Sequence, residues 1–127
     1  MSEIVLEHVN LTVSDPRASA ARLVELFGWH IRWEGAARGS GYTVHVGGAS
    51  SYLALYGENP EAVAAPNSYV TAGGLNHVGV EVADLDAVRE RVTAAGFEPY
   101  GFGEYEPGRR FYFRDPDGVE FEVVSYR

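Results

Sequence analysis

The chain has 127 residues, of which 10 are basic and 18 acidic, and it contains no cysteine. The net charge of −8 argues against nucleic acid or an anionic membrane surface as a partner, because both are bound through basic patches. Without cysteine, a disulfide framework, a thiolate metal site and a cysteine nucleophile are excluded. The first residues lack the pattern of a signal peptide, and we therefore expect a cytoplasmic protein.

A nine-residue motif occurs twice in the chain. Residues 7–15 (EHVNLTVSD) match residues 76–84 (NHVGVEVAD), 69 positions later. Both copies alternate apolar residues with others, which predicts a strand with one face against a core. His8 and His77 occupy equivalent positions and fall on the opposite face from the valines.

A helix is predicted after each repeated strand. Aspartate favours the position before a helix, and glycine favours the position after it. These residues occur as Asp15 and Gly28 around residues 16–27, and as Asp84 and Gly96 around residues 85–95.

Three shorter extended segments follow each helix. They are predicted at residues 29–33, 42–46 and 52–56, and again at residues 98–101, 110–114 and 119–125. The chain is thus expected to be α+β, with a βαβββ module over residues 1–57, a linker over 58–74 and a second βαβββ module over 75–127. One helix covers only one face of each sheet, so the other face is left for a partner or forms a cup.

The repeated strand and the tail FYFRDPDGVEFEV at residues 111–123 resemble the vicinal oxygen chelate superfamily. That superfamily contains glyoxalase I, bleomycin-resistance proteins, fosfomycin-resistance enzymes and extradiol dioxygenases. The resemblance covers nearly the whole chain. It implies a glyoxalase/bleomycin resistance/dioxygenase-type fold, in which two βαβββ modules curl their sheets into a metal-binding cup, and it implies a homodimer.

The resemblance also implies a metal site. In metal-dependent members the ligands come from the first and last strands of both modules, and the matching positions here are His8, Ala54, His77 and Glu122. Ala54 cannot bind a metal, which departs from the four side-chain ligands of glyoxalase I. Two imidazoles and one carboxylate remain. This set suits Fe(II) or Mn(II), with Zn(II) and Ni(II) as alternatives, and leaves positions open for substrate.

Other side chains are expected in the cup from alternation or from their place near the tail motif. The substrate-binding candidates are Asn10, Tyr52, Tyr56, Tyr105, Arg109 and Arg110. Either arginine would neutralise an anionic substrate, although surface charge is the alternative interpretation. Tyr112 lies where extradiol dioxygenases place a tyrosine, which makes it the catalytic candidate, and an aromatic ring that fills the sheet is the alternative.

Some polar and aromatic residues are expected to lie away from the site. Glu120 shares a face with Glu122. We interpret it as solvated surface, and the alternative is a substitute ligand or a residue that supports the metal ligands. His30 and His45 have no counterpart in the other module. Trp33 is expected in a core or at an interface.

Three functions remain open. We favour a divalent-metal-dependent enzyme that chelates a small vicinal-oxygen substrate at a two-His one-Glu site, dioxygenase-like rather than a lyase or isomerase. The stretch near residues 103–105 lacks the acid–base histidine of extradiol enzymes. The first alternative is a metal-free protein of bleomycin-resistance type that sequesters a small drug or metabolite. The second is a thiol transferase of fosfomycin-resistance type.

Overall fold

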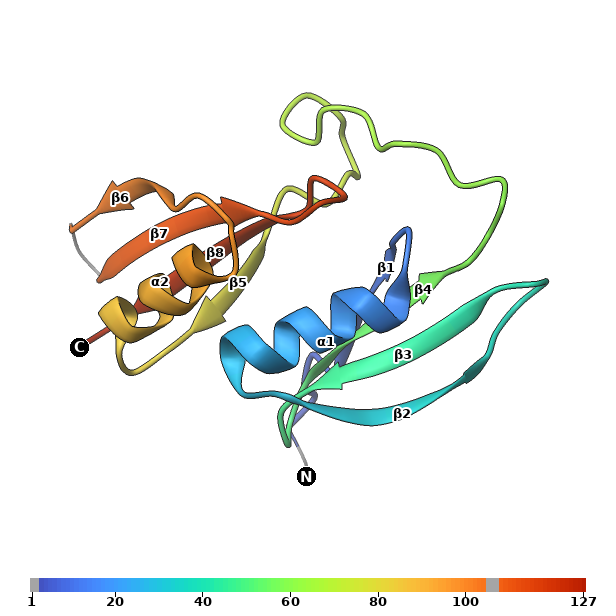
Figure 1. The fold of residues 1–127 in the computed structure, drawn as a ribbon, viewed down its shortest axis with the longest axis horizontal. Coiled ribbons are helices and arrows are strands. Elements are labelled where there is room, and N and C mark those ends of the chain that lie inside the picture. Colours follow the sequence, from blue (N-terminus) through green and yellow to red (C-terminus); the bar gives the residue numbers. More distant parts are fainter. Residues whose placement is uncertain (1–2, 105–107) are drawn as a thin grey trace. The chain divides into compact units, whose positions relative to one another are not determined.

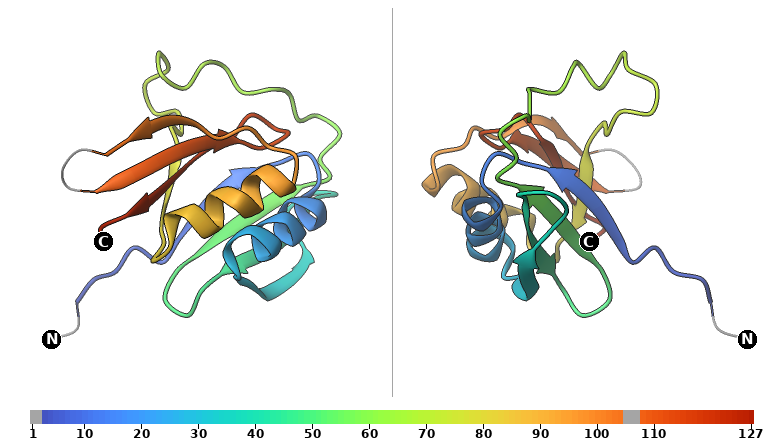
Figure 2. Two further views of the ribbon diagram at one scale, coloured as in Figure 1. Left: turned by 60° about the vertical axis from the view of Figure 1, so that its left-hand side comes forward. Right: turned by 90° about the vertical axis from the view of Figure 1, so that its right-hand side faces the viewer.

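The computed structural model describes residues 3–104 and 108–127. The chain divides into two compact units, unit 1 (Met1–Val63) and unit 2 (Ala64–Arg127) (Figure 1). Each unit contains a four-stranded sheet with one helix packed on one of its faces (Figure 2). The expected α+β fold of two βαβββ modules is confirmed.

Unit 1 follows the βαβββ order. Its elements are β1 (His8–Thr12), α1 (Pro16–Phe27), β2 (His30–Ala36), β3 (Tyr42–Gly47) and β4 (Tyr52–Gly57). The strands lie in the order β1-β4-β3-β2, with β1 parallel to β4 and the other pairs antiparallel.

Unit 2 repeats this plan. Its elements are β5 (Val78–Glu81), α2 (Leu85–Ala94), β6 (Tyr100–Gly103), β7 (Arg109–Arg114) and β8 (Glu120–Ser125). The order β5-β8-β7-β6 again joins the first and last strands of the unit in parallel. In each unit, therefore, the repeated His-containing segment lies beside the last strand.

The predicted caps define where the helices begin. The Asp15 carboxylate accepts a hydrogen bond from the Ala18 amide at 3.1 Å, and Asp84 does the same for Ala87. Gly28 ends α1 with φ of 71°, in the left-handed region that favours glycine. The second helix ends one residue earlier than expected, at Ala94.

Each core lies between the helix and the sheet face that the helix covers. The buried strand residues that alternate toward the helix include Val44 and Leu55 in unit 1, and Phe111 and Phe113 in unit 2. The intervening residues form the opposite face, which we call the helix-free face. It carries most of the polar and aromatic site candidates.

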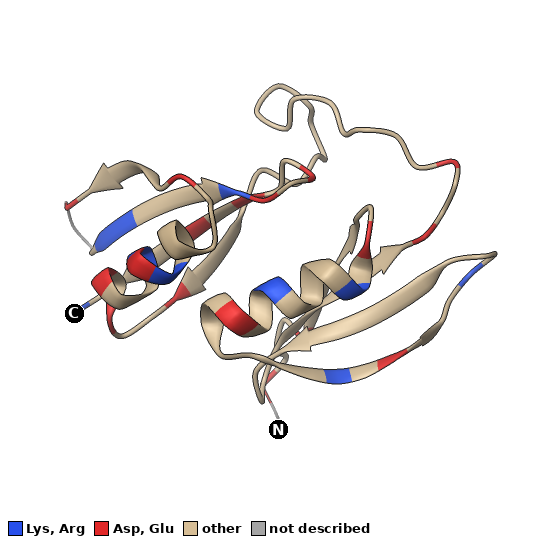
Figure 3. Ribbon diagram, viewed as in Figure 1, with Lys and Arg blue, Asp and Glu red and all other residues tan. Residues whose placement is uncertain are grey.

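Acidic and basic residues are interspersed along the elements of both units (Figure 3). All ten basic residues are arginine. Among the described residues, the two helices are too short and too polar to cross a bilayer.

Candidate functional site

On the helix-free face of unit 2, a carboxylate lies between an imidazole and a guanidinium. Glu122 Oε1 is 3.0 Å from His77 Nε2, and Glu122 Oε2 accepts a hydrogen bond from Arg110 Nη1 at 3.0 Å. The side chains of Glu122 and Arg110 are 12% and 13% exposed, whereas His77 is 33% exposed. The carboxylate is thus held at the base of the site, and the imidazole is its more accessible part.

A neighbouring amide orients His77. Asn76 Oδ1 lies 2.7 Å from His77 Nδ1, and an amide oxygen only accepts, so Nδ1 carries a proton. A neutral ring then presents the lone pair of Nε2 to a Glu122 oxygen, which is also an acceptor. A second proton or a cation between the two atoms satisfies both. Sequence reasoning did not single out Asn76, which precedes the repeated histidine directly.

Tyr112 lies beside this pair. It is opposite Glu122 in the β7–β8 register, and its ring meets His77 edge-on at 5.8 Å between centroids. Its other neighbour is Tyr100, with ring centroids 6.1 Å apart and an interplanar angle of 26°. The catalytic candidate is therefore close to two of the three predicted metal ligands.

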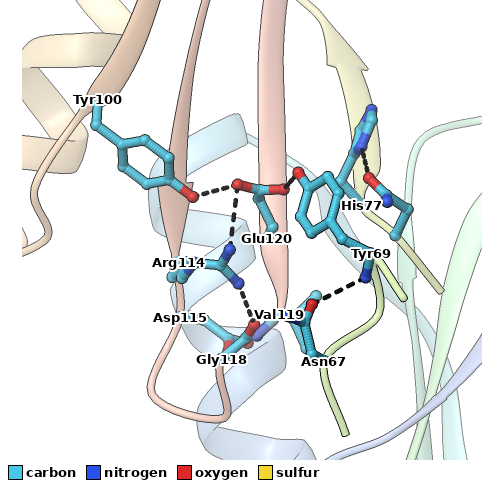
Figure 4. Close-up of polar contacts among 10 residues, drawn as sticks. Asn67, Tyr69, His77, Tyr100, Arg114, Asp115, Gly118, Val119 and Glu120 are labelled. Atoms are coloured by element: carbon cyan, nitrogen blue, oxygen red, sulfur yellow. Dashed lines mark hydrogen bonds and ion pairs between the residues drawn. The ribbon is translucent and has the colours of Figure 1, made fainter. Parts of the chain in front are cut away.

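Glu120 is not the solvated surface residue that we expected. It is 4% exposed, and its carboxylate accepts hydrogen bonds from the hydroxyls of Tyr69 and Tyr100 (Figure 4). Arg114 Nη2 is a further donor at 3.5 Å. Burial acts to raise the pKa of Glu120, but these donors outweigh it and the pKa lies below its usual range. Glu120 is therefore an ionised anchor for surrounding side chains.

The two adjacent arginines have different partners. Arg110 contacts Glu122, whereas Arg109 bonds to Glu104 at 3.2 Å and to Asp86 of α2 at 3.4 Å. Because neighbouring strand residues point to opposite faces, only Arg110 joins the His77–Glu122 pair. Tyr105 lies outside the described residues.

The helix-free face of unit 1 carries four rings in contact, which we call the aromatic row: His8, Tyr52, His45 and Trp33, from β1, β4, β3 and β2. His8 stacks on Tyr52 at 4.9 Å between centroids, and Tyr52 stacks on His45 at 4.6 Å. Trp33 meets His45 at 5.2 Å with a tilt of 55°. The row brings a predicted metal ligand together with a predicted substrate-binding tyrosine.

Two members of the row bear on earlier expectations. His45 lies beside Ala54 in the β3–β4 register, on the same face as the candidates, although we expected it away from the site. Burial lowers its pKa, and the nearby His8 and Arg32 act in the same direction, which favours a neutral imidazole. Trp33 is 53% exposed, which contradicts a place in the core and leaves the interface alternative as a prediction.

An open hollow of about 420 Å³ adjoins the aromatic row. Its lining residues all belong to unit 1 and are Asn10, Ala37, Arg38, Thr43, His45 and Tyr56. The Tyr56 hydroxyl donates to the Arg38 carbonyl at 3.2 Å and accepts from Asn59 Nδ2 at 3.4 Å. Two predicted substrate-binding residues, Asn10 and Tyr56, therefore share one concave surface.

The predicted metal ligands divide between the units. Unit 2 holds His77 and Glu122 in contact, and unit 1 holds His8, whose Nδ1 is 3.0 Å from Glu7 Oε1. Within residues 3–104 and 108–127, neither unit by itself gathers three His, Asp or Glu side chains into a metal-binding cluster. The donor types of the three residues nevertheless fit a divalent metal.

A family model described as the Glyoxalase/Bleomycin resistance protein/Dioxygenase superfamily matches residues 5–123. A search of curated proteins finds no match. A glyoxylase/bleomycin resistance protein/dioxygenase domain from Frankia sp. EAN1pec is 25% identical, with a TM-score of 0.83, over 99% of this chain and 100% of that one.

Two solved structures that are less than 25% identical share the fold. The antibiotic binding protein TnmS3 from Streptomyces sp. CB03234 is 21% identical over 98% of both chains, with a TM-score of 0.75. A mutant of the fosfomycin resistance protein FosX from Listeria monocytogenes, complexed with Mn(II) and 1S,2S-dihydroxypropylphosphonic acid, is 20% identical. It aligns over 97% of this chain and 93% of that one, with a TM-score of 0.72.

Proposed function

Because the chain belongs to the Glyoxalase/Bleomycin resistance protein/Dioxygenase superfamily, we propose that it is a divalent-metal-dependent enzyme that uses His8, His77 and Glu122 as ligands. The contact of 3.0 Å between His77 Nε2 and Glu122 Oε1 carries the proposal. When the ring is neutral, both atoms carry a free lone pair, and a cation in place of a second proton would satisfy them together. Three protein ligands of this type suit Fe(II) or Mn(II), and they leave room for two oxygens of a small substrate.

The surrounding residues have separate roles in this proposal. Asn76 fixes the His77 tautomer that leaves Nε2 available, as outer partners of metal-bound histidines do. Arg110 holds the second oxygen of Glu122, so that one oxygen is left for a cation. The bound metal would supply Lewis-acid stabilisation of a substrate oxyanion. Tyr112, beside His77, is assigned to hold or donate a proton at the substrate.

The reaction that we propose is dioxygenase-like, and the substrate is a small molecule with vicinal oxygens. The FosX structure, which contains Mn(II), supports a divalent metal in this fold. We further propose that the protein works in the cytoplasm as a homodimer.

The test is the metal content of protein purified without chelator or affinity-tag metal. We expect one ion per chain, lost in the His8→Ala and Glu122→Gln variants. His30→Ala is the matched control, because His30 is an exposed histidine of unit 1 outside the ligand set. Protein that binds none of Fe(II), Mn(II), Zn(II) or Ni(II), or that binds them equally after both substitutions, would refute the proposal.

The aromatic row favours a second candidate function, the metal-free sequestration of a small drug or metabolite. Four rings in contact on the helix-free sheet face of unit 1 offer a stacking surface. TnmS3, which shares the fold, is an antibiotic binding protein. The metal-content measurement separates the two candidates, because sequestration on the aromatic row needs no ion.

A further inference from the structure

A buried carboxylate in unit 2 binds two tyrosines that come from separate parts of the chain. Glu120 Oε1 accepts a hydrogen bond from the Tyr69 hydroxyl, and Glu120 Oε2 accepts one from the Tyr100 hydroxyl (Figure 4). Tyr69 lies before β5, and Tyr100 is the first residue of β6. Hydrogen bonds to an ionised group are stronger than those between neutral groups. Both hydroxyls are therefore held at fixed points beside the start of β8.

Tyr69 belongs to a turn that holds its own shape. Asn67 Oδ1 accepts a hydrogen bond from the Tyr69 amide at 3.0 Å, and the Asn67 carbonyl accepts one from the Thr71 hydroxyl at 2.7 Å. Side-chain bonds of this kind to nearby backbone groups define local turns. His77 follows shortly after this turn. Because Glu120 holds the turn through Tyr69, it limits where the chain can place His77.

The second tyrosine leads to His77 through another ring. Tyr100 stacks on Tyr112, whose ring meets His77 edge-on at 5.8 Å between centroids. Gly101 permits this packing, because a Cβ atom there would lie 2.8 Å from the Tyr112 ring. Burial and the bond to Glu120 raise the pKa of Tyr100 to about 12, so its hydroxyl remains a donor at neutral pH.

The carboxylate provides direction rather than stability alone. Burying an ionised group carries a desolvation penalty, and apolar side chains of similar size often stabilise a fold as well or better. Glu120 is 4% exposed at a position where an apolar residue would pack against its neighbours. An apolar residue would leave the two hydroxyls without a common acceptor. The carboxylate therefore fixes the two tyrosines in a way that apolar packing would not.

We propose that Glu120 is a positioning residue for the candidate site of unit 2. Through Tyr69 it fixes the place of His77. Through Tyr100 it fixes the orientation of the Tyr112 ring. The inference rests on the proposed function, in which His77 is a metal ligand and Tyr112 holds or donates a proton. The two routes are separable, because the tyrosines bind different oxygens of the carboxylate and lead to different side chains.

The test removes one hydroxyl at a time and leaves the carboxylate and both rings in place. Metal-free protein is studied by NMR, so that the result does not depend on a bound ion. In Tyr69→Phe we expect the order parameter of the His77 backbone amide to fall from about 0.85, typical of rigid backbone, toward about 0.6. In Tyr100→Phe we expect the three-bond couplings that report χ1 of Tyr112 to change from one rotamer to an average of several.

Tyr42→Phe is the matched control. The Tyr42 hydroxyl donates to Glu34 at 2.8 Å, so the substitution also removes a bond between tyrosine and glutamate, but in unit 1. We expect it to change neither the His77 order parameter nor the Tyr112 couplings. The same changes in Tyr42→Phe would mean that loss of any such bond loosens the chain, and would overturn the proposal.

A second readout connects positioning with the proposed metal. Loss of an outer partner of a metal ligand weakens metal binding by at least about tenfold. We therefore expect Tyr69→Phe to raise the Kd for Mn(II) about tenfold, measured from the electron paramagnetic resonance signal of free Mn(II). Tyr42→Phe should bind Mn(II) as the parent does.

Each route has a result that overturns it. A His77 amide that is as ordered in Tyr69→Phe as in the parent removes the first route, and a single Tyr112 rotamer in Tyr100→Phe removes the second. A parent chain that binds no Mn(II) refutes the metal proposal instead. The NMR measurements on metal-free protein then still decide whether Glu120 positions these side chains.

Discussion

At the scale of single residues, Thr43 carries a polar atom that lowers the stability of the folded chain. Its Oγ1 is buried without a partner, so Thr43→Val removes the cost of desolvating that atom and keeps the side-chain volume. We expect the variant to be more stable by about 1 kcal/mol, measured by urea unfolding of ligand-free protein. Thr12→Val, at an exposed threonine of β1, should change stability by less than about 0.5 kcal/mol. A less stable Thr43→Val chain would mean that the hydroxyl is satisfied in solution.

The sequence predicted the sheet face to which each site residue points better than it predicted how buried each residue is. Period-two alternation correctly grouped His8, Asn10 and Tyr52 on one side, because a strand fixes the side to which each residue points. It could not predict the burial of Glu120. The cover comes from Tyr69, 51 residues earlier, and no local pattern encodes so distant a contact.

At the scale of elements, Tyr69 attaches the segment before β5 to the sheet of unit 2. Its hydroxyl donates to the buried Glu120 carboxylate, and a hydrogen bond to a charged group is stronger than a neutral one. We expect Tyr69→Phe to lower the free energy of unfolding, measured by urea denaturation, and Tyr126→Phe to leave it nearly unchanged. Tyr126→Phe is the matched control, because Tyr126 is 54% exposed and Tyr69 56%.

The effect of Tyr69→Phe should depend on pH. The pKa of Glu120 is lower in the folded chain than its ordinary value of 4.5, so the anion stabilises the fold above that pH. This contribution is lost as the pH falls through the lowered pKa and the carboxyl becomes protonated. The difference between Tyr69→Phe and the parent should therefore shrink in acid. A difference that stays the same after the Glu120 carboxyl has been protonated, as followed by NMR of its side chain, would show that the charge of Glu120 does not strengthen this bond.

Local signals predicted the helices more closely than the edge strand β6. Asp15 and Asp84 cap their helices through contacts three residues away, which sequence alone encodes. The strand expected at residues 98–101 is found at Tyr100–Gly103, where its pairing with β7 is irregular. Gly101 adopts φ of 68°, and a Cβ there would press on the Tyr112 ring at 2.8 Å. The bounds of β6 therefore depend on its contact with β7. The alternation of residues within β6 does not predict that contact.

At the scale of the whole molecule, the internal repeat predicts the architecture because each copy specifies the same local sequence of strand, helix and strands. The repeat also gives each unit one sheet face that its own helix does not cover. The two faces differ in chemistry, since unit 1 carries the aromatic row and unit 2 carries His77, Glu122 and Arg110. The repeat predicted two equivalent histidines, but it did not predict this division of roles, which arises from residues outside the motif.

The proposed metal draws ligands from both units, and this makes a prediction about stability. A ligand that binds only the folded chain stabilises it by about 2.7 kcal/mol at a concentration of 100 times its Kd. Mn(II) should therefore raise the melting temperature of the parent chain and of His30→Ala. If His8 is a ligand, the rise is lost in His8→Ala as well as in Glu122→Gln. A rise that survives His8→Ala but not Glu122→Gln would place the ion on His77 and Glu122 of unit 2 alone, and would remove unit 1 from the metal site.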